Sequence, residues 1–165
     1  MVTIGSTAVK VLTQILKGNQ GLSNILVQMG LNESLNTGGL TDVQVLEQHV
    51  ASDLAERSLG TKYPIFYAYC ERIRNLQREK FRLFSGTLQM VIEVRFTHDR
   101  LDQLQSGLHI LVDAVVSVLS SHVGIWAEGI CYGGGYDISF GGVKQGGKNY
   151  LQSAKVEFHL DVSRD

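Results

Sequence analysis

Residues 87–119 read TLQMVIEVRFTHDRLDQLQSGLHILVDAVVSVL, and the apolar period of this stretch changes partway along. Over Thr87 to Thr97 apolar and polar side chains alternate, which predicts a strand with one core-facing side. From Leu101 onward apolar residues recur at intervals of three and four, which predicts a helix of about five turns with Asp99 as its N-cap. Such a helix is expected to lie across a sheet. The predicted core face of the strand consists of Leu88, Met90, Ile92, Val94 and Phe96.

Three further segments have strand patterns. Ile65 to Ile73 is rich in β-branched and aromatic residues and follows Pro64, which can open a strand without losing a ladder bond. Trp126 to Phe140 and Tyr150 to Val162 predict two more strands, separated by glycines. The sequence therefore predicts the α+β class: an antiparallel sheet built from two hairpins, with the long helix and N-terminal helices packed on one face.

The N-terminal part predicts helices. Apolar residues at helical spacing indicate a helix over Ser6 to Leu16, with Ser6 or Thr7 as N-cap and Gly18 as a left-handed C-cap. The same spacing indicates a second helix over Leu22 to Met29, which stops at Gly30.

The segment that follows these helices is less regular. Residues 31–41 predict a loop, Val43 and Val45 a short strand, and residues 52–59 a turn or two of helix. Because the chain shows neither a repeat nor a linker, we expect residues 1–165 to form a single domain.

Composition excludes several classes of protein. Charged residues make up only 19% and the net charge is -1, so a nucleic-acid or acidic-membrane binder would have to rely on a local patch. Two distant cysteines give no disulfide framework and favour a reducing compartment. The longest apolar stretch, Leu108 to Leu119, is shorter than the ~20 residues that span a bilayer, so we expect a soluble, intracellular protein with no membrane partner.

The sequence contains no short motif typical of a phosphate-binding loop, a metal site or a catalytic centre. Gly133 to Gly135 continue into a strand and precede no helix, so they predict a bulge or bend and no phosphate-binding loop. Neither cysteine has a catalytic or metal partner nearby in sequence, and Cys70 and Cys131 are expected to be buried structural thiols. The sequence favours no enzyme, cofactor or metal, although a ligand pocket against Trp126 and the glycine-rich strand stays open as an alternative. The histidines are expected at the surface or at helix ends: His49, His98, His109, His122 and His159.

One segment is strongly basic. Between Arg72 and Arg82 five positive charges face the single acid Glu79, which gives +4, whereas residues 101–143 contain no lysine or arginine. This segment is either a solvated hairpin loop or a tip that meets DNA phosphate or an acidic neighbouring subunit. A second hairpin could add its lysines if both tips share one end of the sheet. The candidate contact residues are Arg72, Arg74, Arg78, Lys80, Arg82, Lys144 and Lys148.

About 100 residues from Tyr63 to the C-terminus resemble the tail terminator, or tail completion, proteins of long-tailed bacteriophages. The resemblance is carried by YPIFYAYCERIRN, by REKFRLFSGT leading to VIEVRFTHDRLD, and by YGGGYDISFGGVKQGGKNYLQSAKVEFHLDV. It implies a structural virion protein, assembled in the host cytoplasm, that forms a hexameric ring, caps the tail tube and stops its polymerisation. The implied partners are further copies of the chain, the tail tube protein, the head–tail connector and the genomic DNA passing through the ring.

Two other functions stay open at this stage. The chain could be a head–tail adaptor, or a stopper, one layer nearer the portal. It could also be a small nucleic-acid-binding domain that stacks bases on aromatic residues near the basic segment, which are Tyr67, Tyr69, Phe81 and Phe84.

Overall fold

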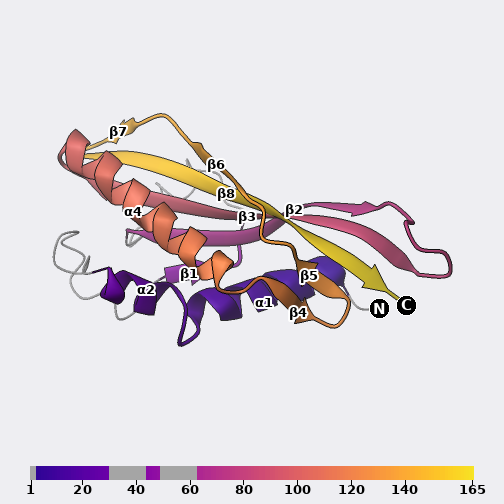
Figure 1. Cartoon of the computed structure of the whole chain (residues 1–165). Coiled ribbons are helices and arrows are strands. Elements are labelled where there is room, and N and C mark those ends of the chain that lie inside the picture. Colours follow the sequence, from indigo (N-terminus) through magenta and orange to yellow (C-terminus); the bar gives the residue numbers. More distant parts are fainter. Residues whose placement is uncertain (1–2, 30–43, 49–62) are drawn as a thin grey trace.

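The computed structural model describes residues 3–29, 44–48 and 63–165. Figure 1 shows long strands running the length of the molecule, with α4 crossing them and α1 and α2 alongside. The predictions for residues 31–41 and 52–59, and for Val43, Gly30 and His49, lie outside the described residues. The helices are α1 (Ile4–Lys17), α2 (Leu22–Gln28) and α4 (Leu101–Ser120). The strands are β1 (Gln44–Leu46), β2 (Ile65–Asn75), β3 (Phe84–His98), β4 (Gly124–Ala127), β5 (Ile130–Tyr132), β6 (Asp137–Phe140), β7 (Lys144–Gly146) and β8 (Asn149–Arg164).

The strands form one sheet in the order β1-β2-β3-β8-β5-β4, and β6 and β7 also pair with β8. β3 lies antiparallel to both β2 and β8, and its pairing with β8 extends from Phe84↔Arg164 to His98↔Tyr150. β1 pairs parallel with β2, so the sheet is mixed where the sequence predicted an antiparallel one. The predicted α+β class is confirmed.

The predicted single strand from Trp126 to Phe140 is wrong. This segment contains the end of β4 followed by β5 and β6, because glycines turn the chain between them. Gly129 has a φ of 70° and Gly134 a φ of 97°, values that favour glycine. β5 and β6 consequently pair in succession with the same long strand, β8.

One apolar core lies between the helices and the sheet. The predicted core face of β3 is fully buried there, as are alternate residues of β8 from Ala154 to Val162. The apolar face of α4 packs on β3 and β8, and Leu12 of α1 and Leu26 of α2 join the same cluster.

By length and mean hydropathy (1.2), α4 is the one described helix that could cross a membrane.

The predicted helix caps are wrong. α1 begins after Thr3, whose carbonyl oxygen accepts from the Ser6 hydroxyl (2.9 Å), so Ser6 caps no amide. Gly18 ends the helix in an extended conformation (φ -69°, ψ 178°) and not in a left-handed one. At α4 the N-cap is Arg100, not Asp99, and its backbone N–H donates to Nδ1 of His98 (3.0 Å).

The opposite face of the sheet carries a smaller cluster that the sequence did not predict. Tyr67, Tyr69 and Val91 are buried there, although alternation alone suggests an exposed polar face. Nη2 of Arg95 lies 3.1 Å from Oε2 of Glu93, and the guanidinium lies 4.5 Å from the centre of the Tyr67 ring. Only 2% of Arg95 and 7% of Glu93 are exposed, so their charges compensate each other inside the protein.

Candidate interaction surface

The β2–β3 hairpin extends beyond the helical layer. Figure 1 shows its end projecting past the helices beside the last residues of β8, and we call residues 72–86 the arm. Gly86 allows the two strands to approach closely, because a Cβ at this position would lie 1.8 Å from the carbonyl oxygen of Arg74. A bulge between Cys70 and Arg72 marks the start of the arm in β2.

The loop at the end of the arm is organised by Asn75. Its Nδ2 donates to the carbonyl oxygen of Leu83 (3.2 Å), and its Oδ1 accepts from the backbone N–H groups of Gln77 (3.2 Å) and Ser85 (3.3 Å). The backbone N–H of Leu76 donates to the Ser85 carbonyl oxygen (3.0 Å). These bonds span the loop and give it a defined conformation.

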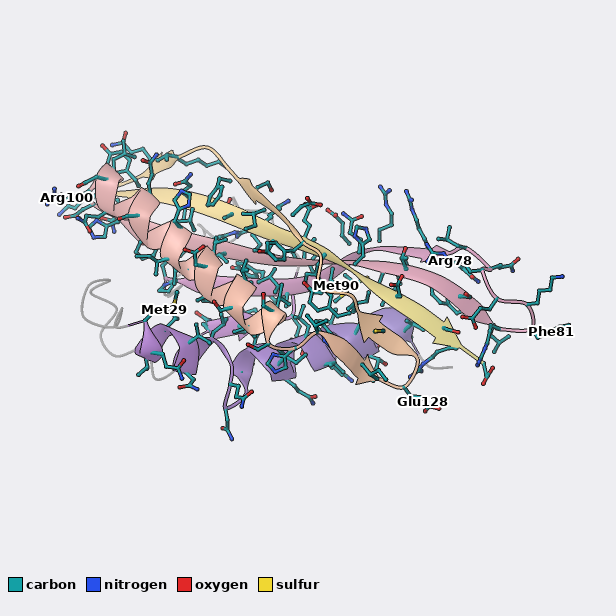
Figure 2. The ribbon with its side chains drawn as sticks, viewed as in Figure 1. Met29, Arg78, Phe81, Met90, Arg100 and Glu128 are labelled. Atoms are coloured by element: carbon teal, nitrogen blue, oxygen red, sulfur yellow. The ribbon has the colours of Figure 1, made fainter. Side chains whose placement is uncertain are left out.

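The tip of the arm exposes large apolar side chains. Phe81 is 100% exposed, Leu83 81% and Leu76 48%. Figure 2 shows Phe81 at the far end of the molecule, distant from Met90 in the core. Contiguous exposed apolar patches occur at protein–protein and membrane interaction sites and at ligand-binding grooves. Sequence reasoning missed this tip, although the signal was present as FRLF at residues 81–84, because the neighbouring charges dominated the interpretation.

All seven basic candidates are exposed, but their electrostatic surroundings differ. Arg78 lies 3.6 Å from the Asp161 carboxylate, and Arg82 pairs with both Glu79 (3.4 Å) and Asp165. These exposed pairs contribute little to stability, about 0–1 kcal/mol each, but they reduce the net charge of the tip. Arg72, Arg74 and Lys80 make no ion pair with any other residue that the structure describes.

Lys144 and Lys148 lie away from the arm. Lys144 is in β7 opposite Leu151, and Lys148 is in the turn between β7 and β8. The arm pairs with the other end of β8, near Ser163. At about 3.3 Å per residue, the twelve residues from Leu151 to Ser163 separate the two groups by roughly 40 Å. The structure therefore does not bring the lysines and the arm to one end of the sheet.

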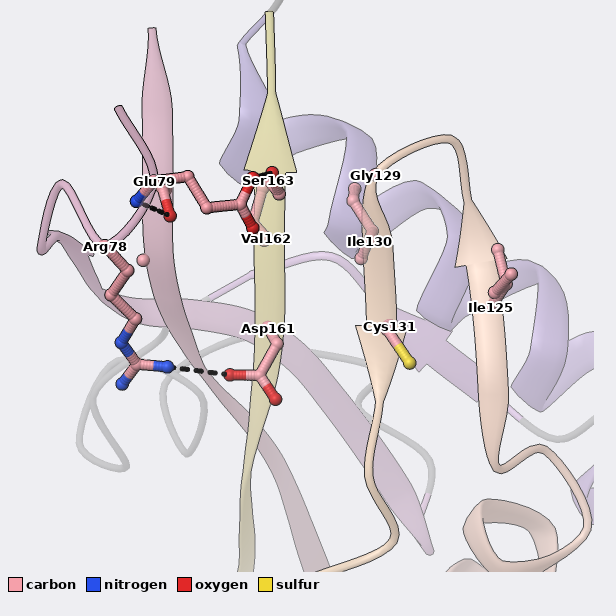
Figure 3. A pocket seen from close by; sticks show the side chains of 11 residues that line it. Arg78, Glu79, Ile125, Gly129, Ile130, Cys131, Asp161, Val162 and Ser163 are labelled. Atoms are coloured by element: carbon pink, nitrogen blue, oxygen red, sulfur yellow. Dashed lines mark hydrogen bonds and ion pairs between the residues drawn. The ribbon is translucent and has the colours of Figure 1, made fainter. Parts of the chain in front are cut away.

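A groove of about 290 Å³ runs along the helix-free face beside the arm. Figure 3 shows Arg78 and Glu79 on one wall and Ile125 and Cys131 on the other, with β8 as the floor. Oε2 of Glu79 accepts from the Ser163 hydroxyl (2.8 Å), which ties the arm loop to β8. The groove thus combines an ion-paired wall with an exposed aliphatic one.

The two thiols differ in environment. Cys70 is half-buried, and burial raises the pKa of its thiol, although a backbone hydrogen bond with Arg72 partly opposes the effect. Cys131 is exposed, so the prediction of a buried thiol is wrong there. β5 lies near the sheet edge, and the side chain of Cys131 points to the helix-free face (Figure 3).

The described histidines lie at the surface or near helix ends, as predicted. His98 precedes α4, His122 follows it, and the His109 ring lies 4.4 Å from that of Phe140. Over residues 3–29, 44–48 and 63–165, no three His, Cys, Asp or Glu side chains are placed to share a metal ion.

An open hollow of about 610 Å³ lies at Trp126, between α1 and the residues that follow α4. Its lining includes no residue of the glycine-rich strand, so the predicted pocket between that strand and Trp126 is not the one that forms. Nε1 of Trp126 donates to the His122 carbonyl oxygen (2.6 Å), and its ring packs on Tyr132 and Phe158 at 5.5 and 5.7 Å. The indole is therefore held as part of the fold.

No family model matches this sequence, and no curated protein matches it.

Proposed function

We propose that this chain is a tail terminator of a long-tailed bacteriophage. It forms a hexameric ring on the end of the tail tube, stops tube polymerisation and offers the surface to which the head connector binds. The sequence resemblance from Tyr63 onward supports this proposal, together with the surface properties of the described fold.

The observation that carries the proposal is the arm. A hairpin that projects from the body and ends in exposed Phe81 and Leu83 has no role in the core of its own chain. Aromatic and large apolar side chains are typical anchors of protein interfaces, where they fill pockets of a partner. Because the loop is held by Asn75, the anchors are already positioned and lose little entropy on binding.

The charge distribution is consistent with a ring of identical subunits. The segment 72–82 carries +4, whereas residues 101–143 contain only acidic charged residues. Unlike surfaces at different places on one chain favour head-to-tail contacts, and such contacts close into rings when the rotation between neighbours permits.

Other candidate functions find less support. A stopper or adaptor of the neck would use the same kinds of surface, and gene order next to the tube protein gene separates it from a terminator. A base-stacking nucleic-acid domain would need several exposed aromatic rings, but Tyr67 is 3% and Tyr69 4% exposed, which leaves Phe81 as the one fully exposed ring of the four candidates.

Native mass spectrometry tests the proposal with two matched double variants. Phe81→Ser/Leu83→Ser removes the arm anchors, while Val27→Ser/Met29→Ser removes exposed apolar residues of the α2 end (55% and 42% exposed). We expect a hexamer for the wild-type chain, alone or with tube protein, and for the α2 variant. The arm variant should need at least about 10-fold more protein to assemble, equivalent to ~1.4 kcal/mol.

Two results would contradict this expectation. A wild-type chain that stays monomeric with and without tube protein would remove the ring. An arm variant that assembles as well as the wild type would remove the arm from the interface. Circular dichroism of the variants checks that the fold is retained.

A further inference from the structure

A second hollow lies on the helix-free face where the arm begins. Its volume is about 180 Å³, and its lining side chains are all polar: Arg72, Arg74, Thr87, Gln89 and His159. The sheet register explains the grouping. Arg72, Gln89 and His159 occupy one row across β2, β3 and β8, and Arg74 and Thr87 occupy the adjacent row.

No carboxylate in the described part of the chain forms an ion pair with either arginine of the hollow. Asp161 follows Thr87 in the second row, but its carboxylate pairs with Arg78 at 3.6 Å. Oε2 of Glu71 accepts a hydrogen bond from Nε2 of Gln89 (2.8 Å). A third carboxylate of this region belongs to Glu157, which lies two residues before His159 on the same face of β8.

We infer that this hollow is a phosphate-binding site and that its ligand is the backbone of DNA. The inference rests on the proposed function, since DNA that passes through the ring supplies the phosphates. Guanidinium groups donate paired hydrogen bonds to phosphate oxygens, and the Thr87 hydroxyl adds another donor. Water occupies about 30 Å³ per molecule in the liquid, so the hollow has room for a phosphate group and part of its hydration shell.

The polar lining favours phosphate over a protein partner. Protein interfaces have an apolar centre surrounded by polar residues, and this hollow offers no apolar side chain. The apolar anchors Phe81 and Leu83 lie farther along the arm, at its tip. One hairpin thus provides a protein-binding tip and a separate phosphate-binding base.

Salt-dependent binding of duplex DNA tests this assignment. The variant Arg72→Gln/Arg74→Gln removes the site, and Lys144→Gln/Lys148→Gln removes equal charge at the other end of the sheet. Each phosphate contact contributes about 0.9 to the slope of log affinity against log salt concentration. If both arginines of one subunit contact phosphates, the slope measured for the arginine variant should be smaller by about 1.8 than that of the wild type. Between about 50 and 200 mM salt, the affinity of this variant should therefore decrease by a factor ~12-fold smaller than that of the wild type. The lysine variant should keep the wild-type slope.

Three results would overturn the assignment while leaving the ring in place. They are wild-type rings that bind no duplex at low salt, equal loss of slope in both variants, and an arginine variant with the wild-type slope. Binding of a polyglutamate peptide but not DNA, with the same arginine dependence, would also overturn it and indicate an acidic protein ligand. Native mass spectrometry of the same samples reports the hexamer separately, so failure of the proposed function is recognised by monomeric protein.

Discussion

Replacement of Gly86 by alanine tests how the arm is built. The new Cβ would lie 1.8 Å from the carbonyl oxygen of Arg74 and 2.8 Å from its carbonyl carbon, both of them backbone atoms. To reach an ordinary contact of 3.4 Å the strands must separate by roughly 1.6 Å. This movement disrupts the adjacent pairs Arg74↔Thr87 and Asn75↔Gly86.

The expected cost follows from the backbone hydrogen bonds at those pairs. Losing two or three of them, at a net value of about 1 kcal/mol each, lowers the free energy of unfolding by about 2–3 kcal/mol. For a chain of this length that corresponds to a decrease in Tm of about 4–12 °C. Thermal unfolding followed by circular dichroism measures the change, and hydrogen exchange at the Leu76 amide shows whether the arm opens first.

Gly133 provides the matched control. A Cβ at Gly133 would have no atom within 4 Å, so Gly133→Ala should change the free energy of unfolding by no more than about 0.5–1 kcal/mol. If Gly86→Ala and Gly133→Ala unfold within about 2 °C of each other, the close approach at Gly86 does not determine the stability of the arm.

Three further predictions concern the buried ion pair, the thiols and the arm loop. Glu93→Ala leaves the Arg95 charge without this partner and should lower the free energy of unfolding by about 3–5 kcal/mol. In the double variant with Arg95→Ala, the loss of unfolding free energy should be smaller than the sum of the losses in the two single variants. Additive losses in urea unfolding would contradict coupling of the pair. A maleimide should label exposed Cys131 before Cys70, because the raised pKa of Cys70 leaves less thiolate at a given pH and moves its labelling to higher pH. In the variant Cys131→Ser only Cys70 can react, and labelling as fast as in the wild type would refute this order. Asn75→Ala removes three hydrogen bonds of the loop and should lower the free energy of unfolding by about 1–3 kcal/mol, with faster proteolysis at the tip. Protease resistance equal to that of the wild type would show that other contacts hold the loop.

The periodicity of residues 87–119 was sufficient to predict the strand, the helix and the core face of β3, because burial on one side leaves a regular trace in the sequence. The pattern failed at Trp126 to Phe140, where glycines with positive φ break one apparent strand into shorter ones. It also failed at Glu93 and Arg95, since a charged pair that is buried together has the same alternation as an exposed polar face.

The basic segment was found from charge counting, but its internal organisation was not. Which arginine faces a carboxylate depends on sheet register, and only the register places Asp161 beside the arm. The same register separates Lys144 from the arm along β8. The exposed tip at Phe81 could have been inferred from apolar residues in a predicted hairpin loop, where a chain without a partner usually places polar ones.

The proposed capping activity is tested most directly by the growth of tail tubes in vitro. Purified tube protein is allowed to polymerise with and without this chain, and tube lengths are measured by negative-stain electron microscopy. The proposal predicts that substoichiometric amounts of the chain stop elongation and leave a ring at one end of each shortened tube, and that the Phe81→Ser/Leu83→Ser variant does so poorly. Tubes of unchanged length, with no ring at either end, would contradict it.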